Sequence, residues 1–325
     1  MVIHMPNKLE YNIAVADMAP GDNIEGFYIL KDASIRTTSN GKAFLAGALS
    51  DSTGVIDLKV WDYTGPLGTD KNDIGKVIKV RGEVGEFKGS RQFSAALIRL
   101  ADANDQYNIS ELVPTAPISA SETFAKVKEM INSVQDEDYR KIALDFLSRH
   151  TDSFRNLPAA KSFHHAFLHG LLMHTSNMMK LADFLAGLYS EVINRDLLIT
   201  GAFLHDMAKD REFVTSPLGL VTDYSAKGQL LGHLVMGAQE VAVTAERLGV
   251  PEEKSILLQH LILSHHGEPE HGAAVVPCVA EAELLAYIDG IDSRMEIYAE
   301  QMAEMEPGDI SQRIPALEKR IYKHE

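Results

Sequence analysis

The spacing of apolar residues changes from a period of two to a period of three or four near residue 110. In residues 55–61, Ile56, Leu58 and Val60 alternate with Asp57, Lys59 and Trp61, which indicates a strand with one buried face. Comparable segments, separated by turn residues, lie at 25–35, 43–50, 76–84 and 91–100. Since no long helical pattern interrupts these five segments, we expect them to form a small closed β-barrel.

Two loops of this barrel combine positive charge with aromatic rings. A five-stranded barrel of this kind, the OB-fold, binds oligonucleotides through the loops after its first and fourth strands, here residues 36–42 and 86–91. Charge attracts phosphates and flat rings stack on bases, so these residues predict a surface for single-stranded nucleic acid. The expected contacts are Arg36, Lys42, Phe44, Trp61, Phe87, Lys88, Arg91 and Phe93. The alternative is ordinary β-domain chemistry, with lysines in turns, phenylalanines in the core and Trp61 filling one end of the barrel.

The region around residue 110 indicates a domain boundary. Residues 103–122 have little periodicity and contain two prolines, which is typical of a linker. The sequence SASE at 119–122 matches a capping box that begins a helix. We therefore expect a multidomain α and β protein, with an OB-fold barrel in residues 1–104, a linker in 105–120 and an all-α helical bundle in 121–325.

Composition and charge narrow the classes of function. Hydrophobic residues make up 45% of the 325 residues, with no apolar run of the ~18 residues that a membrane helix needs. We see no secretory signal pattern at the N-terminus, and the single cysteine, Cys278, suits a reducing cytoplasm. The net charge of −15 is uneven. Residues 1–110 contain 12 Lys and Arg and 14 Asp and Glu, whereas the remainder contains 19 and 32. The N-terminal part is therefore the better candidate for binding nucleic acid, because it repels phosphates less.

The histidines gather in the helical half, where ten of the thirteen lie between His164 and His271. A single histidine on an apolar helix is usually a core residue with a hydrogen-bond partner, and a single His-Asp pair is usually a hydrogen-bonded couple. Here five apolar helices each carry an imidazole or a carboxylate: His174, His205, Asp206, His233, His265, His266 and Asp289. Because unpaired buried polar groups are costly, this repetition predicts that a cation holds them together.

The residue types predict the identity and the number of the cations. Imidazole and carboxylate without thiolate suit Mn²⁺, Fe²⁺, Co²⁺, Ni²⁺ or Zn²⁺. The ligands for one ion would be His174, His205, Asp206 and Asp289; a second would use His233, His265 and His266, with Asp206 as a bridge. Two neighbouring ions can activate water and neutralise both reacting oxygens in phosphoester hydrolysis. Lys209, one turn after His205, is positioned to reach a substrate phosphate, unless it is only a surface lysine.

Together these residues resemble the HD superfamily of metal-dependent phosphohydrolases. Longer blocks at 157–175, 232–237 and 264–292, with RIYK near the C-terminus, resemble the YhaM-type 3′-5′ exoribonucleases, in which an OB-fold precedes the HD domain. The resemblance covers nearly the whole chain. It implies removal of nucleotides from the 3′ end of single-stranded RNA, and also of single-stranded DNA, with Mn²⁺ as the typical ion.

The resemblance also implies roles for individual residues. It supports the ligand set above and adds His164 and His165 as contacts to the phosphodiester, beside Asp206 and Lys209; the alternative for the two histidines is packing at the start of a helix. His169 stands where the family pattern has glycine, and Tyr287 stands where a smaller or polar residue is common. Both departures bear on substrate preference more than on the chemistry.

Two other functions stay open at this point. One is hydrolysis of free or cyclic nucleotides, with the barrel as a regulatory or oligomerising domain. The other is a single-strand-binding adaptor with an inert helical domain, which would be expected to lack a ligand; none is missing from the sequence. A homo-oligomer is compatible with each of the three.

Overall fold

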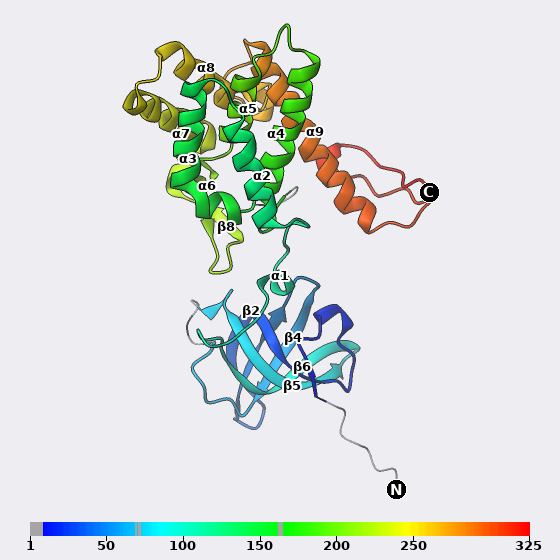
Figure 1. Cartoon of the computed structure of the whole chain (residues 1–325). Helices are drawn as coiled ribbons and strands as arrows, with labels where there is room; N and C mark the ends of the chain where they lie inside the picture. The colour runs from blue at the N-terminus through cyan, green and yellow to red at the C-terminus, as the bar shows by residue number, and fades with distance from the viewer. Residues whose placement is uncertain (1–8, 69, 71–72, 162–164) are drawn as a thin grey trace. The chain divides into compact units, whose positions relative to one another are not determined.

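The computed structural model describes residues 9–68, 70, 73–161 and 165–325 (Figure 1). The main division of the chain falls between Pro114 and Thr115, inside the predicted linker, and separates two compact units. Each unit has a hydrophobic core of its own. We therefore describe them one after the other.

The first unit is a barrel whose strands close on themselves. Its elements are β1 (Leu9–Tyr11), η1 (Val15–Asp17), β2 (Asn23–Thr37), β3 (Ala43–Ser50), β4 (Val55–Trp61), β5 (Val77–Phe87), β6 (Ser90–Leu100) and α1 (Ile109–Leu112). The strand order is β2-β3-β4-β6-β5, and β5 pairs again with β2. Only β4 and β6 are parallel within this ring. This order is that of a five-stranded Greek-key barrel and confirms the predicted OB-fold. The three-residue β1, parallel to β2, was too short to predict from periodicity.

The interior of the barrel follows the alternation seen in the sequence. Leu58 of β4, Val84 of β5 and Phe93 of β6 are neighbours in the strand register and are fully buried. Their outward neighbours are more polar, as expected for a sheet with one buried face. Phe93 is thus a core residue, and the prediction that it contacts nucleic acid is wrong, because a ring with no exposed surface cannot stack on a base.

The second unit is built mainly of helices. Its elements are α2 (Ala120–Asn132), α3 (Glu137–Asn156), α4 (Gly170–Leu188), α5 (Arg195–Leu204), α6 (Lys209–Glu212), β7 (Phe213–Thr215), β8 (Val221–Tyr224), α7 (Ala226–Leu248), α8 (Glu252–Ser264), η3 (Pro269–His271), α9 (Ala280–Ala303) and η4 (Pro315–Leu317). The predicted cap of α2 is present: the Ser119 side chain accepts a hydrogen bond from the Glu122 amide. No helix in the part of the chain that the structure describes is both long and apolar enough to cross a membrane.

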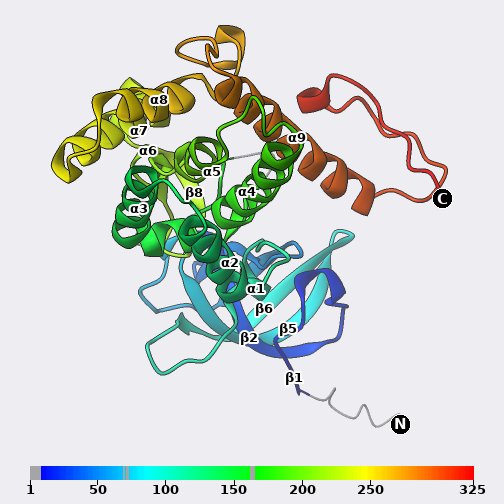
Figure 2. The same cartoon turned by 45° about the horizontal axis from the view of Figure 1, so that its top comes forward.

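The short helix α5 is the centre of this unit. All residues from Leu197 to Leu204 are buried, and α5 packs against α3, α4, α8 and α9 (Figure 2). A helix that is apolar on every side must be surrounded by protein. Gly201 permits the close approach of α8, because a Cβ there would lie 2.3 Å from Leu261 Cδ2. The residues that follow α5 therefore start from a fixed position inside the unit.

The unit differs from the predicted all-α bundle in two places. Strands β7 and β8 form a small hairpin between α6 and α7. After α9 the chain folds back through η4 and two isolated β-bridges, over a small core of Ile297, Ile314, Leu317 and Ile321. These segments are too short to produce a recognisable period in the sequence.

Candidate active site and nucleic-acid surface

The His-Asp pair lies directly after the central helix α5. The His205 amide continues the helix by donating to Gly201 O, and the His205 Nδ1–H donates to Ala202 O at 2.9 Å. These bonds fix the ring so that Nε2 points away from the helix and lies 3.3 Å from Asp206 Oδ2. Both side chains are buried. The His205 ring is thus oriented before any ligand binds.

Helix α4 contributes His174, whose ring is held from behind by a carboxylate of α9. The Asp292 Oδ2 atom accepts hydrogen bonds from His174 Nδ1 at 2.7 Å and from His165 Nε2 at 2.8 Å. The opposite nitrogen, His174 Nε2, lies 3.2 Å from His205 Nε2 and 3.3 Å from Asp289 Oδ1. Two imidazole nitrogens and two carboxylates therefore face one point.

Helix α7 presents His233 through a break in its backbone. Gly232 adopts φ +70° and ψ 165°, a conformation that favours glycine, so the helix is kinked immediately before His233. The freed His233 amide and its Nδ1–H both donate to Glu212 Oε1 at 3.0 Å. The ring then points its Nε2 at Asp206 Oδ1, 3.3 Å away.

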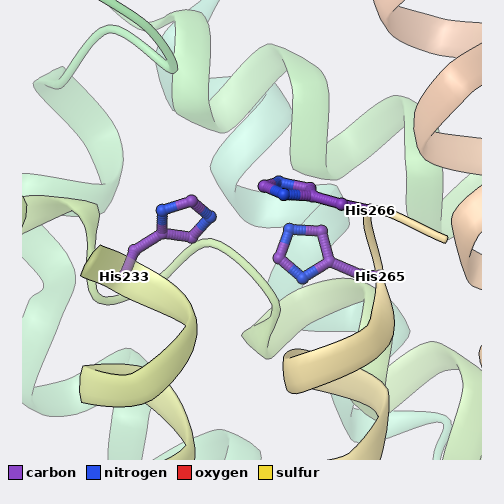
Figure 3. A group of neighbouring side chains, drawn as sticks. All are labelled: His233, His265 and His266. Atoms are coloured by element: carbon purple, nitrogen blue, oxygen red, sulfur yellow. The ribbon is translucent and has the colours of Figure 1, made fainter. Parts of the chain in front are cut away.

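Helix α8 is followed directly by two adjacent histidines. The His265 Nδ1–H donates to Ile262 O at 2.7 Å, which leaves Nε2 directed inward, 3.8 Å from Asp206 Oδ1. Figure 3 shows the rings of His233, His265 and His266 turned toward a shared space, with His233 at the kink of α7 and the other two just after α8. The ring centroids of His265 and His266 are 4.3 Å apart.

The donor atoms fit divalent cations. Several of the buried side-chain atoms that lack a hydrogen-bond partner within the described residues belong to this group: Asp206 Oδ1, His233 Nε2, His265 Nε2 and His266 Nδ1. Donor atoms within 4.8 Å of one another form two sets on either side of Asp206: His174, His205 and Asp206, and His233, His265 and His266. Buried polar atoms without partners are costly, and ligation removes that cost. The two oxygens of Asp206 face different sets, which is the bridging position predicted from the sequence.

The charges of the group suit a cation as well. Burial acts to raise the pKa of Asp206, but the charges of Lys209 and His205 outweigh it and hold this pKa well below its ordinary value. Burial, together with His266 and His205, lowers the pKa of His265 well below its ordinary value, so that ring is neutral. The hydrogen bonds to Asp289 and Asp292 outweigh burial at His174 and raise its pKa to about 9. A cation at His174 Nε2 would have to displace that proton.

A third set of possible donors, His165, His174 and Asp292, has a different explanation. Asp292 binds the Nδ1 side of His174, away from the other ligands, which is the usual place for a group that orients a ligand ring. Glu212 stands in the same relation to His233. Neither carboxylate was predicted. Only the spacing of Asp292, three residues after Asp289 on one helix, could have indicated it, and no signal marked Glu212.

The other predicted site residues have mixed outcomes. The Lys209 ammonium donates to Asp206 Oδ2 at 2.6 Å and lines the pocket, so Lys209 is not a surface lysine. His165 is buried against Asp292, and His164 lies outside the described residues. His169 precedes α4 with φ +64°, a conformation that glycine adopts more readily than histidine. Tyr287 is 62% exposed and does not line the pocket.

On the barrel, the predicted nucleic-acid contacts divide into two groups. Arg36, Phe44 and Trp61 form one outward row across β2, β3 and β4. The Phe44 and Trp61 rings are 5.1 Å apart, and the Lys59 ammonium lies 5.5 Å from the Phe44 ring. Lys42 is exposed beside this row and pairs with Asp62. The row is an exposed aromatic platform with positive charge around it, on the strand face that OB-folds use for binding.

The remaining contacts lie on the β5–β6 hairpin. Phe87 is 60% exposed, and Lys88, at the turn, lies over its ring. Arg91 differs, because one nitrogen of its guanidinium donates to the carbonyls of Val15, Ala16 and Met18. That part of the side chain stabilises η1, so Arg91 has less capacity for phosphate than its sequence position indicated.

The chain is similar to known proteins both over its helical unit and over nearly its whole length. The family model described as HD domain matches residues 171–294. Over 302 residues the chain is 35% identical to the 3′-5′ exoribonuclease YhaM of Geobacillus sp. (strain WCH70), which covers 93% of this chain and 92% of that protein. The protein of the same name from Halalkalibacterium halodurans is 34% identical and covers 93% of each chain. A replication protein A domain from Methanococcus maripaludis is 17% identical over 28% of this chain and 94% of that domain, with a TM-score of 0.24. So low a score carries no argument, and the barrel assignment rests on strand order.

Proposed function

The chain belongs to the YhaM family of 3′-5′ exoribonucleases, and on that premise we propose that it removes nucleotides stepwise from the 3′ end of single-stranded RNA by metal-dependent hydrolysis. The observation that carries the proposal is the position of Asp206, whose two oxygens face separate sets of histidine nitrogens. Phosphodiester hydrolysis at paired ions uses this kind of arrangement.

The residues of the chain have distinct parts in this reaction. The ligands are His174, His205, Asp206, His233, His265, His266 and Asp289. Divalent ions bound there supply Lewis acidity toward the phosphate and toward water. Asp292 and Glu212 hold the rings of His174 and His233 in the orientation that presents Nε2. Lys209 holds Asp206 Oδ2 and brings positive charge to the pocket that receives the phosphate.

We infer that the ion is Mn²⁺ and that two ions bind. The donors are imidazole and carboxylate without thiolate, a mixture that suits Mn²⁺ better than a structural Zn²⁺ site. Two donor sets around one carboxylate support the count. The exposed row on the barrel, Arg36, Phe44 and Trp61, binds the strand by phosphate charge and base stacking, a mode that accepts single-stranded DNA as well as RNA.

Purified protein with Mn²⁺ and a single-stranded RNA labelled at one end tests the proposal. A 3′ label should be released at once as a mononucleotide, while a 5′ label should shorten one nucleotide at a time. Asp206→Asn should abolish both signals, and Asp152→Asn, on the exposed side of α3, should abolish neither. Hydrolysis of free nucleotides without loss from the RNA end would contradict the proposal.

A further inference from the structure

The pocket beside the ligands has a wall of which the reaction described above uses only Asp289. The cavity has a volume of about 460 Å³, and His174, Asp206, His265 and His266 line one side. Helix α9 lines the other side with Ala286, Asp289, Gly290, Ser293 and Arg294. These positions are three or four residues apart, so they share one face of the helix.

Gly290 has no structural reason to be a glycine. It lies inside α9, where glycine is less favourable than any side chain except proline. A Cβ built at this position meets no atom of the described residues within 4 Å, so none of those residues requires its absence. The effect of the glycine is to leave space open in the pocket, directly beside the ligand Asp289.

Arg294 is one turn further along the same face and is exposed. Within the described residues its guanidinium has no hydrogen bond or ion pair, whereas the other cation of the pocket, Lys209, is bound to Asp206. Arg294 lies five positions after Asp289 in the helix, a rise of about 7.5 Å along the axis. That is the scale of the spacing between neighbouring phosphates in an extended strand. Arginine binds phosphate with two parallel hydrogen bonds.

We propose that α9 is the strand-binding wall of the active site: Gly290 leaves room for the terminal nucleotide, and Arg294 binds the backbone phosphate that precedes the scissile one. The inference rests on the proposed function. Since Arg294 is exposed and Asp289 is deeper, the 5′ part of the strand passes Arg294 on its way out. The substrate recognised is thus an oligonucleotide with at least two phosphates, rather than a free nucleotide.

Arg294→Gln tests the phosphate contact. We expect KM for a short RNA to rise about tenfold with kcat unchanged, and the slope of affinity against salt to fall by about one. Bound metal should stay the same. For a dinucleoside monophosphate, which has a single phosphate, variant and wild type should not differ. Arg320→Gln, another exposed arginine of this unit outside the pocket lining, is the matched control and should leave KM unchanged. An unchanged KM in Arg294→Gln would overturn the inference.

Gly290→Leu tests the open space. Because the Cβ meets no neighbour and leucine favours helix, the midpoint of thermal unfolding should not fall, while RNA cleavage should drop at least tenfold. Gly187→Leu is the matched control, since Gly187 is an exposed glycine of α4 whose Cβ also meets nothing within 4 Å. It should keep full activity. Full activity in Gly290→Leu would also overturn the inference.

The two proposals fail in different ways. If the wild-type protein does not cleave RNA with Mn²⁺, the proposed function is wrong. If it cleaves RNA and the α9 variants behave like their controls, only the strand-binding wall is wrong.

Discussion

At the scale of single residues, the carboxylates that orient the histidine rings are as important as the candidate metal ligands themselves. Glu212 accepts from both the amide and the ring of His233, and Asp292 accepts from His174 and His165. The sequence indicated each ligand because a polar residue interrupts an apolar helix. It could not indicate Glu212, which stands in a polar stretch and acquires its role only when the kink at Gly232 brings His233 beside it.

Glu212→Gln should lower metal affinity and RNA cleavage by about 10- to 100-fold, because the amide loses the negative charge that orients the His233 ring and makes it a better donor. Isothermal titration with Mn²⁺ and single-turnover cleavage measure the two effects. Glu246→Gln, on the exposed side of α7, should change neither. Equal values for the two variants would mean that Glu212 does not position the ligand.

Aromatic residues of the barrel give a second prediction at this scale. Trp61 is 54% exposed and Phe93 is fully buried. Replacing Trp61 should therefore affect binding, and replacing Phe93 should affect stability. Trp61→Ala should weaken binding of a single strand by about 1–3 kcal/mol with little effect on unfolding. Phe93→Ala should destabilise the barrel by about 3–5 kcal/mol. Fluorescence anisotropy of labelled RNA and thermal unfolding separate the two, and unweakened binding in Trp61→Ala would contradict the stacking role.

At the scale of elements, a buried ion network joins helices that no pattern in the sequence connects. His150 of α3 bonds to Asp210 of α6 at 2.6 Å and to Glu240 of α7 at 2.7 Å. Glu240 also pairs with Arg149 and Arg211. The periodicity predicted the helices and the capping residue of α2, but the partners in this network are 60 and 90 residues from His150 in the chain. Contacts of that range do not appear in a local pattern.

The network predicts how stability depends on pH. Burial opposes protonation of His150, but the bonds to Asp210 and Glu240 outweigh it and raise its pKa to about 9. Because this pKa is higher in the folded state than in the unfolded state, protonated His150 stabilises the folded protein. The contribution to the free energy of unfolding, about 3 kcal/mol at most, is complete below pH ~6.5 and is lost as the pH rises through 9. Urea unfolding across this range should show the loss. In His150→Gln the dependence should weaken to the part due to His174, whose pKa is also raised to about 9. His324→Gln, at the exposed C-terminal end, should keep the full dependence.

At the scale of the whole molecule, the sequence predicted both folds and their order, because each has a period of its own. The strand ring β2 to β6 and the helices that carry the ligands are where the pattern placed them. The β7–β8 hairpin and the C-terminal segment were not predictable, since their short pieces gain order only by packing on larger elements.

Two separate cores predict a divided response to chelation. All the candidate ligands belong to the helical unit, and the barrel core has none. A cation at 100 times its dissociation constant stabilises the state that binds it by about 2.7 kcal/mol. In differential scanning calorimetry, EDTA should therefore lower the unfolding temperature of the helical unit and leave the barrel transition in place. A shift of the barrel transition alone would contradict this placement of the metal.

The carboxylate of Asp206 has one further consequence. Its two oxygens belong to a single plane, with His205 on one edge and His233 on the other. A divalent ion held by one of these oxygens would fix the orientation of that plane, and with it the position of the oxygen left for a second ion. Binding of the two ions should then be interdependent, so that a titration with Mn²⁺ does not fit a model of two independent sites.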